Sequence, residues 1–134
     1  MKTLLLFFLL FGAMQAQEYA VIGSKRTPEL SPAQIKAVFL KKLTHYQGLH
    51  LVPINLPASS ELRKKFEKEL LHMNFIRLKS YWSKQHYLGN RPPLSLKSQE
   101  SALLFVAKVQ GAITYVNIEN ITKDVKILYR WRDE

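Results

Sequence analysis

Strand-like and helix-like patterns alternate along residues 19–128, and this alternation restricts the fold more than any other feature. Four apolar runs are typical of strands, and they cover residues 19–23, 49–56, 112–118 and 125–128. Pro53 lies in the second run, and because proline lacks a backbone donor we expect it at a sheet edge or at a strand end. Helical patterns separate the first three runs, so the sequence predicts a layered α/β domain rather than a helical bundle.

Four segments place their apolar residues at the spacing of one helix face, and they cover residues 31–40, 59–73, 75–87 and 98–109. Ser31 before a proline is a typical helix start, because the hydroxyl accepts from a first-turn amide and proline needs no partner there. Ser59 or Ser60 before Glu61 starts the second segment in the same way. Gly111 follows the last helix, where we expect a positive φ.

The amino-terminal segment has the outline of a secretory signal peptide, with Lys2, an apolar run over residues 4–11 and small residues that end at Ala16. This run is shorter than the roughly 20 residues of a membrane-spanning helix. We therefore expect residues 1–16 to be a cleaved signal peptide and residues 17–134 to be one exported domain without stable membrane insertion. An uncleaved membrane tether and a buried first strand are the alternatives.

The charge balance indicates anionic partners. Twenty Lys and Arg residues against ten Asp and Glu residues give a formal net charge of +10. Such a charge attracts phosphate groups, acidic proteins or nucleic acid, but export argues against nucleic acid. The chain has no cysteine, which excludes thiol catalysis, disulfides and cysteine-ligated zinc.

Catalytic and cofactor motifs are absent from the sequence. It has no nucleophile elbow, no Walker-type loop, no zinc-protease motif and no evident acid–base carboxylate pair, so we expect neither an enzyme nor a cofactor. The four histidines fall in different predicted segments without metal-ligand spacing; they are His45, His50, His72 and His86. We therefore expect no metal site.

Two loops carry side chains that suit an oxyanion. Ser59 and Ser60 precede a helix, where hydroxyls and first-turn amides can cradle an anion, although plain capping explains the same residues. The loop after the first strand holds a second set, namely Ser24, Lys25, Arg26 and Thr27. Loops at strand ends commonly bind ligands in α/β sheets, and a solvated loop is the alternative.

Two larger groups of side chains also allow two interpretations each. A basic group can form a surface for anions or can be an ordinary solvated helix face; its members are Lys41, Lys42, Arg63, Lys64, Lys65 and Lys68. An aromatic group can stack on sugars or bases; its members are Tyr81, Trp82, His86 and Tyr87. The helical spacing of Phe75, Leu78 and Trp82 favours a core position for Trp82 instead.

Several motifs resemble the second lobe of the phosphate-type periplasmic substrate-binding proteins of ABC transporters. They are Val38-Phe39-Leu40-Lys41-Lys42 with Tyr46, Val52-Pro53-Ile54-Asn55, Phe66, Tyr81-Trp82 with Gly89 and Pro92-Pro93, and Gly111-Ala112-Ile113-Thr114-Tyr115-Val116. The resemblance covers most of residues 19–128. It implies one periplasmic-binding-protein-like (type II) lobe with a small mixed sheet flanked by helices, a periplasmic location, and phosphate as ligand. Thr114 joins the candidate ligands through this resemblance.

The sequence departs from that family where the family binds its anion. Ser60-Glu61-Leu62 stands where the resemblance implies Ser-Gly-Thr, and Leu56 falls near the family's Arg position. Glu61 opposes the attraction of a helix start for anions. Two hypotheses follow. The chain is a non-enzymatic exported protein that binds phosphate or another anionic ligand, or it is an interaction or scaffold protein of the envelope that has lost phosphate binding.

Overall fold

A computed structural model describes residues 16–133, and the predicted α/β fold is confirmed within them. Five strands form one sheet in the order β5-β4-β6-β1-β7. Their bounds are β1 Glu18–Ser24, β4 Val52–Asn55, β5 Leu94–Ser95, β6 Ala112–Asn117 and β7 Val125–Arg132. β4, β5 and β6 run parallel, whereas β1 is antiparallel to both β6 and β7, so the sheet is mixed.

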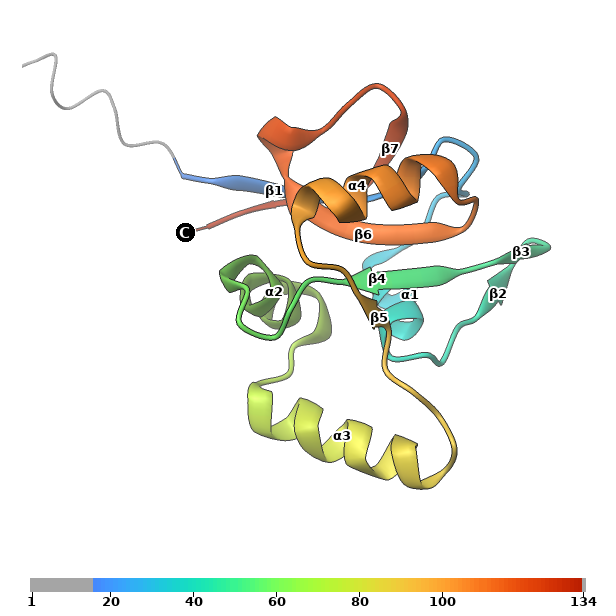
Figure 1. Ribbon diagram of the computed structural model, residues 1–134, viewed down its shortest axis with the longest axis vertical. Coiled ribbons are helices and arrows are strands. Elements are labelled where there is room, and N and C mark those ends of the chain that lie inside the picture. The colour runs from blue at the N-terminus through green and yellow to red at the C-terminus, as the bar shows by residue number, and fades with distance from the viewer. Residues whose placement is uncertain (1–15, 134) are drawn as a thin grey trace, which may run out of the picture.

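Helices connect most of these strands (Figure 1). Their bounds are α1 Pro32–Phe39, α2 Glu61–Phe66, α3 Phe75–Tyr87 and α4 Gln99–Lys108. α2 continues as a short π-helix, η2 Glu67–Leu71, and a 3-10 turn, η3 Ile118–Asn120, follows β6. The hydroxyls of Ser31 and Ser60 accept first-turn amides, which confirms both predicted helix starts. Gly111 has φ +86°, as expected.

The strand predicted over residues 49–56 is divided in two. Residues 45–50 form a separate hairpin, with strands β2 His45–Tyr46 and β3 Leu49–His50. Gln47 and Gly48 both have positive φ, the backbone geometry of a tight hairpin turn. β4 lies inside the sheet with Pro53 as its second residue, before the pairing with β5 starts at Ile54. The strand-end alternative for Pro53 is therefore the one observed.

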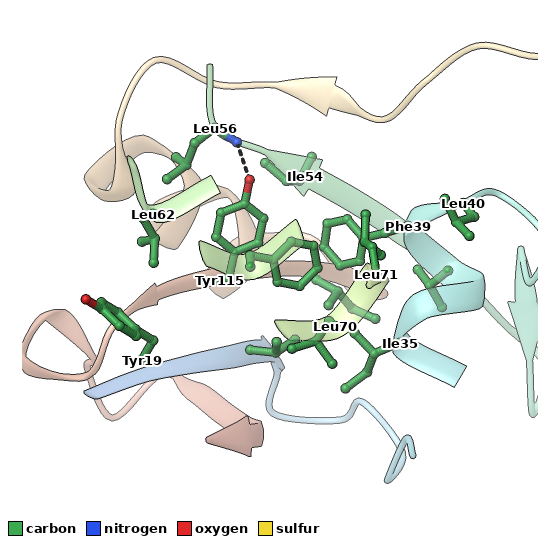
Figure 2. Close-up of a cluster of buried hydrophobic side chains, with 14 of the residues drawn as sticks. Tyr19, Ile35, Phe39, Leu40, Ile54, Leu56, Leu62, Leu70, Leu71 and Tyr115 are labelled. Atoms are coloured by element: carbon green, nitrogen blue, oxygen red, sulfur yellow. Dashed lines mark hydrogen bonds between the residues drawn. The ribbon is translucent and has the colours of Figure 1, made fainter. Parts of the chain in front are cut away.

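The sheet is covered on both faces because successive strand residues point to opposite sides. In β1, Tyr19 and Val21 belong to one buried cluster, which includes side chains of α1 and of α2 with η2. Ala20 and Ile22 belong to a second cluster with the apolar stripe of α4. Figure 2 shows the first cluster, in which Phe39 and Tyr115 lie close together. The chain is therefore built as helix, sheet and helix layers.

α3 lies apart from these layers at one end of the molecule (Figure 1). Its bounds agree with the predicted helix, but Leu78 is its only buried residue. Trp82 is partly buried rather than in the core, and Phe75 is 73% exposed, because α3 contacts the rest of the domain along a narrow line. Across residues 16–133, no helix combines the length and the apolar character needed to span a membrane.

Candidate functional site

The junction between β4 and α2 is fixed by a buried tyrosine. Tyr115 in β6 donates its hydroxyl to Asn55 Oδ1 at 2.7 Å. The same hydroxyl accepts from the Leu56 amide at 3.1 Å (Figure 2). Burial raises the pKa of Tyr115, so the hydroxyl keeps the proton that it donates. This pair of hydrogen bonds sets the direction in which the chain leaves the sheet and enters α2.

At the start of α2, the two predicted serines have different environments. Ser60 Oγ accepts from the Arg63 amide at 3.2 Å, so Ser60 caps α2, as one of its two interpretations predicts. Ser59 is exposed. Glu61 forms an ion pair with Lys64 at 3.1 Å, which partly offsets its negative charge at the helix start.

The capping role of Ser60 leads to a stability prediction. Ser60→Ala should lower the free energy of unfolding by about 1 kcal/mol, because the Arg63 amide loses its acceptor. Ser59→Ala should change it by less than about 0.5 kcal/mol, because Ser59 is an exposed residue outside the cap. Urea denaturation of both variants measures the difference. Equal losses for the two serines would contradict the cap.

The remaining predicted ligands lie elsewhere in the fold. Ser24 Oγ lies 3.0 Å from Thr27 Oγ1, and both residues are buried, whereas Lys25 beside them is exposed. β1 is antiparallel to β6, whereas β4 is parallel to it, so the carboxyl ends of β1 and β4 point in opposite directions. The loop after β1 and Ser60 after β4 therefore lie at opposite ends of the strands. Thr114 is buried within β6 and donates to the Ile54 carbonyl at 2.9 Å. The five predicted residues therefore lie in three separate places.

The structure places an open groove of about 970 Å³ between α2 with η2 on one side and α3 on the other. Its lining residues are Ala58, Arg63, Lys64, Glu67, Lys68, His72, Met73, Asn74, Phe75, Arg77, Leu78, Lys79 and Trp82. We call this feature the α2–α3 groove. The turn before α2 contributes Ala58, and Asn74 is the cap of α3, so the amino-terminal ends of two helices border it.

The rim of the α2–α3 groove is strongly basic. Five cationic side chains line it against the single carboxylate of Glu67, and they are Arg63, Lys64, Lys68, Arg77 and Lys79. Arg63 is held in place, because its Nε lies 3.0 Å from Glu67 Oε2 and its Nη1 donates to the Leu56 carbonyl at 2.9 Å. Lys68, Arg77 and Lys79 take part in none of the ion pairs found within residues 16–133.

The predicted basic group is thus divided by the structure. Arg63, Lys64 and Lys68 line the groove, and so do Arg77 and Lys79 on its α3 side, which were not among the predicted residues. A sequence signal for the second pair exists, because residues 70–99 contain five Lys and Arg residues and no Asp or Glu. That stretch predicts a surface of one sign around α3.

Lys65 belongs to a different cluster at the carboxyl end of the chain. Its Nζ lies 2.6 Å from Asp133 Oδ2, and the Tyr19 hydroxyl donates to the same carboxylate at 2.7 Å. The Lys65 hydrogen bond, with that of Tyr19, holds the pKa of Asp133 below its ordinary value. Lys65 therefore ties β7 to β1 and to α2, and it is not available to the groove.

The aromatic group does not form one stacking surface. Trp82 is partly buried against the groove, and the Tyr81 hydroxyl donates to the Leu40 carbonyl at 2.6 Å. Tyr87 is 92% exposed at the far end of α3. Apolar side chains instead form part of the groove lining, namely Met73, Phe75, Leu78 and Trp82.

The hairpin brings two of the histidines together, which their spacing did not predict. His45 and His50 are paired across β2 and β3, with His50 Nδ1 at 3.3 Å from His45 Nε2. His72 lines the α2–α3 groove. Within the part of the chain that the structure describes, no three potential ligands gather to hold a metal ion.

The fold defined by this sheet and its helices is that of one lobe of phosphate ABC transporter substrate-binding proteins. An ABC-type phosphate transport receptor from Vibrio cholerae matches with a TM-score of 0.66 and 14% identity, over 84% of this chain and 46% of the receptor. A Clostridium perfringens protein, described as a phosphate ABC transporter substrate-binding protein and solved with bound phosphate, matches with a TM-score of 0.67 and 18% identity. That match covers 84% of this chain and 44% of the other.

These structural likenesses establish the fold, and the predicted resemblance to one lobe is confirmed at that level. The chain spans less than half of each similar structure. No protein-family model and no curated protein sequence matches it.

Proposed function

We propose that the chain is an exported, non-catalytic binding domain that holds phosphate or another anionic ligand in the α2–α3 groove. The observation that carries the proposal is the lining of the groove, where five cationic side chains face a single carboxylate. Like charges gathered around one concave surface repel one another, and a bound anion relieves that repulsion. The apolar part of the lining makes the groove less polar than bulk water, which strengthens each contact between a cation and the anion.

The helix ends at the groove add to this electrostatic field. The cap of α3 at Asn74 and the turn before α2 at Ala58 both border the groove, and helix starts carry a partial positive charge. Ser59 and Ser60 follow Ala58 but are not among the lining residues, so we propose them only as hydroxyl donors next to that end of the groove. We assign no ligand role to Ser24, Lys25 or Thr114, because they lie at the other end of the strands or within β6. The similar structure with bound phosphate supports this ligand class.

Export is part of the proposal. The signal peptide predicted over residues 1–16 falls, except for its last residue, outside the described residues. The periplasmic location that we propose is supported by the likeness of the fold to periplasmic binding proteins. We assign no nucleic acid and no cofactor as partner.

A second candidate function is an interaction or scaffold protein of the envelope. Two observations favour it. The Ser60 hydroxyl already caps α2 beside the carboxylate of Glu61, and the chain corresponds to less than half of the similar binding proteins. In this case the lobe is retained as a scaffold, and the basic surface contacts a partner rather than a small anion.

Thermal unfolding in the presence of anions separates the two candidates. Residues 17–134 contain every helix and strand described here, so this segment is the protein to test. Millimolar phosphate or sulfate at fixed ionic strength should raise its Tm, because a ligand that binds only the native state stabilises it, by about 2.7 kcal/mol at a hundred times Kd. An unchanged Tm in every oxyanion would leave the scaffold function.

Charge reversal in the groove should remove the effect of phosphate. Lys68→Glu with Lys79→Glu places two carboxylates on the groove lining without breaking an ion pair, so the Tm should no longer respond to phosphate. The matched control is Lys108→Glu with Lys123→Glu, from the end of α4 and the loop before β7, which has the same net charge. A phosphate response lost equally in the control would show that only net charge matters.

A further inference from the structure

The outward side of α3 combines exposed apolar side chains with cations. Ile76 is 75% exposed and Tyr87 is 92% exposed, and neither residue lines the α2–α3 groove. They are eleven residues apart, which at 3.6 residues per turn places them within about 20° of each other around the helix. An exposed apolar pair thus lies along one line of α3, on the side away from buried Leu78.

Cations flank this line on both sides. By the same geometry Lys79 and Lys84 lie about 70° to either side of it, with Ser80 and Ser83 between the apolar pair. Lys84, like Lys79, takes part in none of the ion pairs formed by residues 16–133. No Asp or Glu occurs anywhere over residues 70–99, so nothing on the helix or in the loop after it opposes the positive charge.

The position of α3 leaves this side open to a large partner. α3 forms one end of the molecule along its longest axis, and only Leu78 of the helix is buried (Figure 1). After α3 ends at Tyr87, the following loop adds two more exposed residues, Leu88 and Arg91, at the carboxyl end of the helix. Exposed apolar side chains with a cation on either side are typical of helices that lie in the interface of an anionic membrane.

We propose that the outward side of α3 binds to the surface of an anionic phospholipid bilayer. The inference goes beyond the proposed anion binding, because Ile76, Tyr87 and Lys84 do not line the groove, whereas Lys79 borders both surfaces. A bilayer fits better than an acidic protein, because this side is a single convex helix with exposed side chains at both ends and no concave pocket of its own. Ser80 and Ser83 keep the contact shallow, so Ile76 and Tyr87 enter only the headgroup region.

Vesicle co-sedimentation of residues 17–134 tests this inference. The protein should bind vesicles of phosphatidylcholine with 30% phosphatidylglycerol. Its partition coefficient for pure phosphatidylcholine vesicles should be lower by about tenfold or more. Binding should fall as salt rises from low to physiological concentration. Equal binding to both vesicle types, or no binding to either, would overturn the proposal, and the second result would leave an acidic protein as the partner of this surface.

Three variants locate the contact on α3. Ile76→Ser with Tyr87→Ser keeps the charge and should weaken binding, and Lys84→Glu with Arg91→Glu should lower the partition coefficient about tenfold or more. The control is Lys108→Glu with Lys123→Glu, which has the same charge as the second variant and should keep most of the binding. Equal losses in the control and the α3 variants would contradict a specific surface.

The same proteins separate this inference from the proposed anion binding. The Ile76 and Tyr87 variant should keep its Tm response to phosphate, because neither residue lines the groove. A protein that responds to phosphate but binds no vesicles overturns only the bilayer contact. A protein that binds vesicles through α3 but does not respond to phosphate overturns only the groove function.

Discussion

Phe66→Ala should lower the free energy of unfolding by about 3–5 kcal/mol, the usual loss for a fully buried phenylalanine. Phe66 is completely buried, and its ring stacks on Tyr115 with centroids 4.2 Å apart. Its centroid also lies 4.6 Å from that of Phe39 in α1. The Phe66 side chain therefore packs between α2, α1 and the sheet. Its truncation leaves a cavity that these three elements cannot close by moving together.

Phe75→Ala is the matched control for this loss. It removes the same atoms from a residue that is 73% exposed, so the free energy of unfolding should change by less than about 0.5 kcal/mol. Urea denaturation with a shared m-value measures both changes. Similar losses at Phe66 and Phe75 would show that the packing around Phe66 is not as described.

Gly111→Ala should be nearly as destabilising, with a loss of about 2–5 kcal/mol. Two costs add here. Gly111 has φ +86°, a conformation that an L side chain adopts only with strain. A Cβ at this position would also collide with the carbonyl oxygen of His50, which belongs to the β2–β3 hairpin. The Gly111 carbonyl accepts from Val52, so a shift of the backbone would disturb the first pairing of β4 with β6.

Gly89→Ala separates strain from collision. Gly89 has φ +89°, almost the same conformation, but a Cβ there meets open space. The expected loss is about 1–2 kcal/mol from strain alone. The excess loss at Gly111, measured by denaturation of both variants, reports the contact with the hairpin. Equal losses of unfolding free energy for Gly111→Ala and Gly89→Ala would mean that the β2–β3 hairpin makes room for the new Cβ at no energetic cost.

Local signals in the sequence were sufficient to predict most of the elements. Ser31 and Ser60 cap their helices, and the bounds of α3 agree with the predicted range, because capping and helical periodicity act within a few residues. Elements that depend on distant partners were less predictable. β7 extends to Arg132, past the predicted end at residue 128, because it pairs with the whole of β1 and buries Trp131 against Tyr19.

The groove could not be predicted from local patterns, because it depends on how α3 is placed relative to α2. His72 has φ +53° and follows η2, and this left-handed residue turns the chain so that α3 leaves the layers of the fold. The basic face of α2 was predicted, whereas its counterpart on α3 was not. The absence of carboxylates over residues 70–99 was the signal that would have drawn attention to α3.

The predicted ligands illustrate a second difficulty. Ser24 and Ser60 each suit an oxyanion by type, but their distance apart depends on strand direction. β1 is antiparallel to β6, so its carboxyl end points the opposite way from that of β4. Residue type alone does not contain this information, because a mixed sheet and a parallel sheet can have the same order of strands and helices along the chain.

Backbone amide NMR of residues 17–134 during a phosphate titration locates the bound anion as well as detecting it. We expect the largest shift changes at the amides of Lys64, Lys68 and residues 74–79, with saturation at millimolar phosphate. Changes confined to the loop of Ser24 and Lys25, or no saturable change anywhere, would contradict the proposal that the α2–α3 groove holds the ligand.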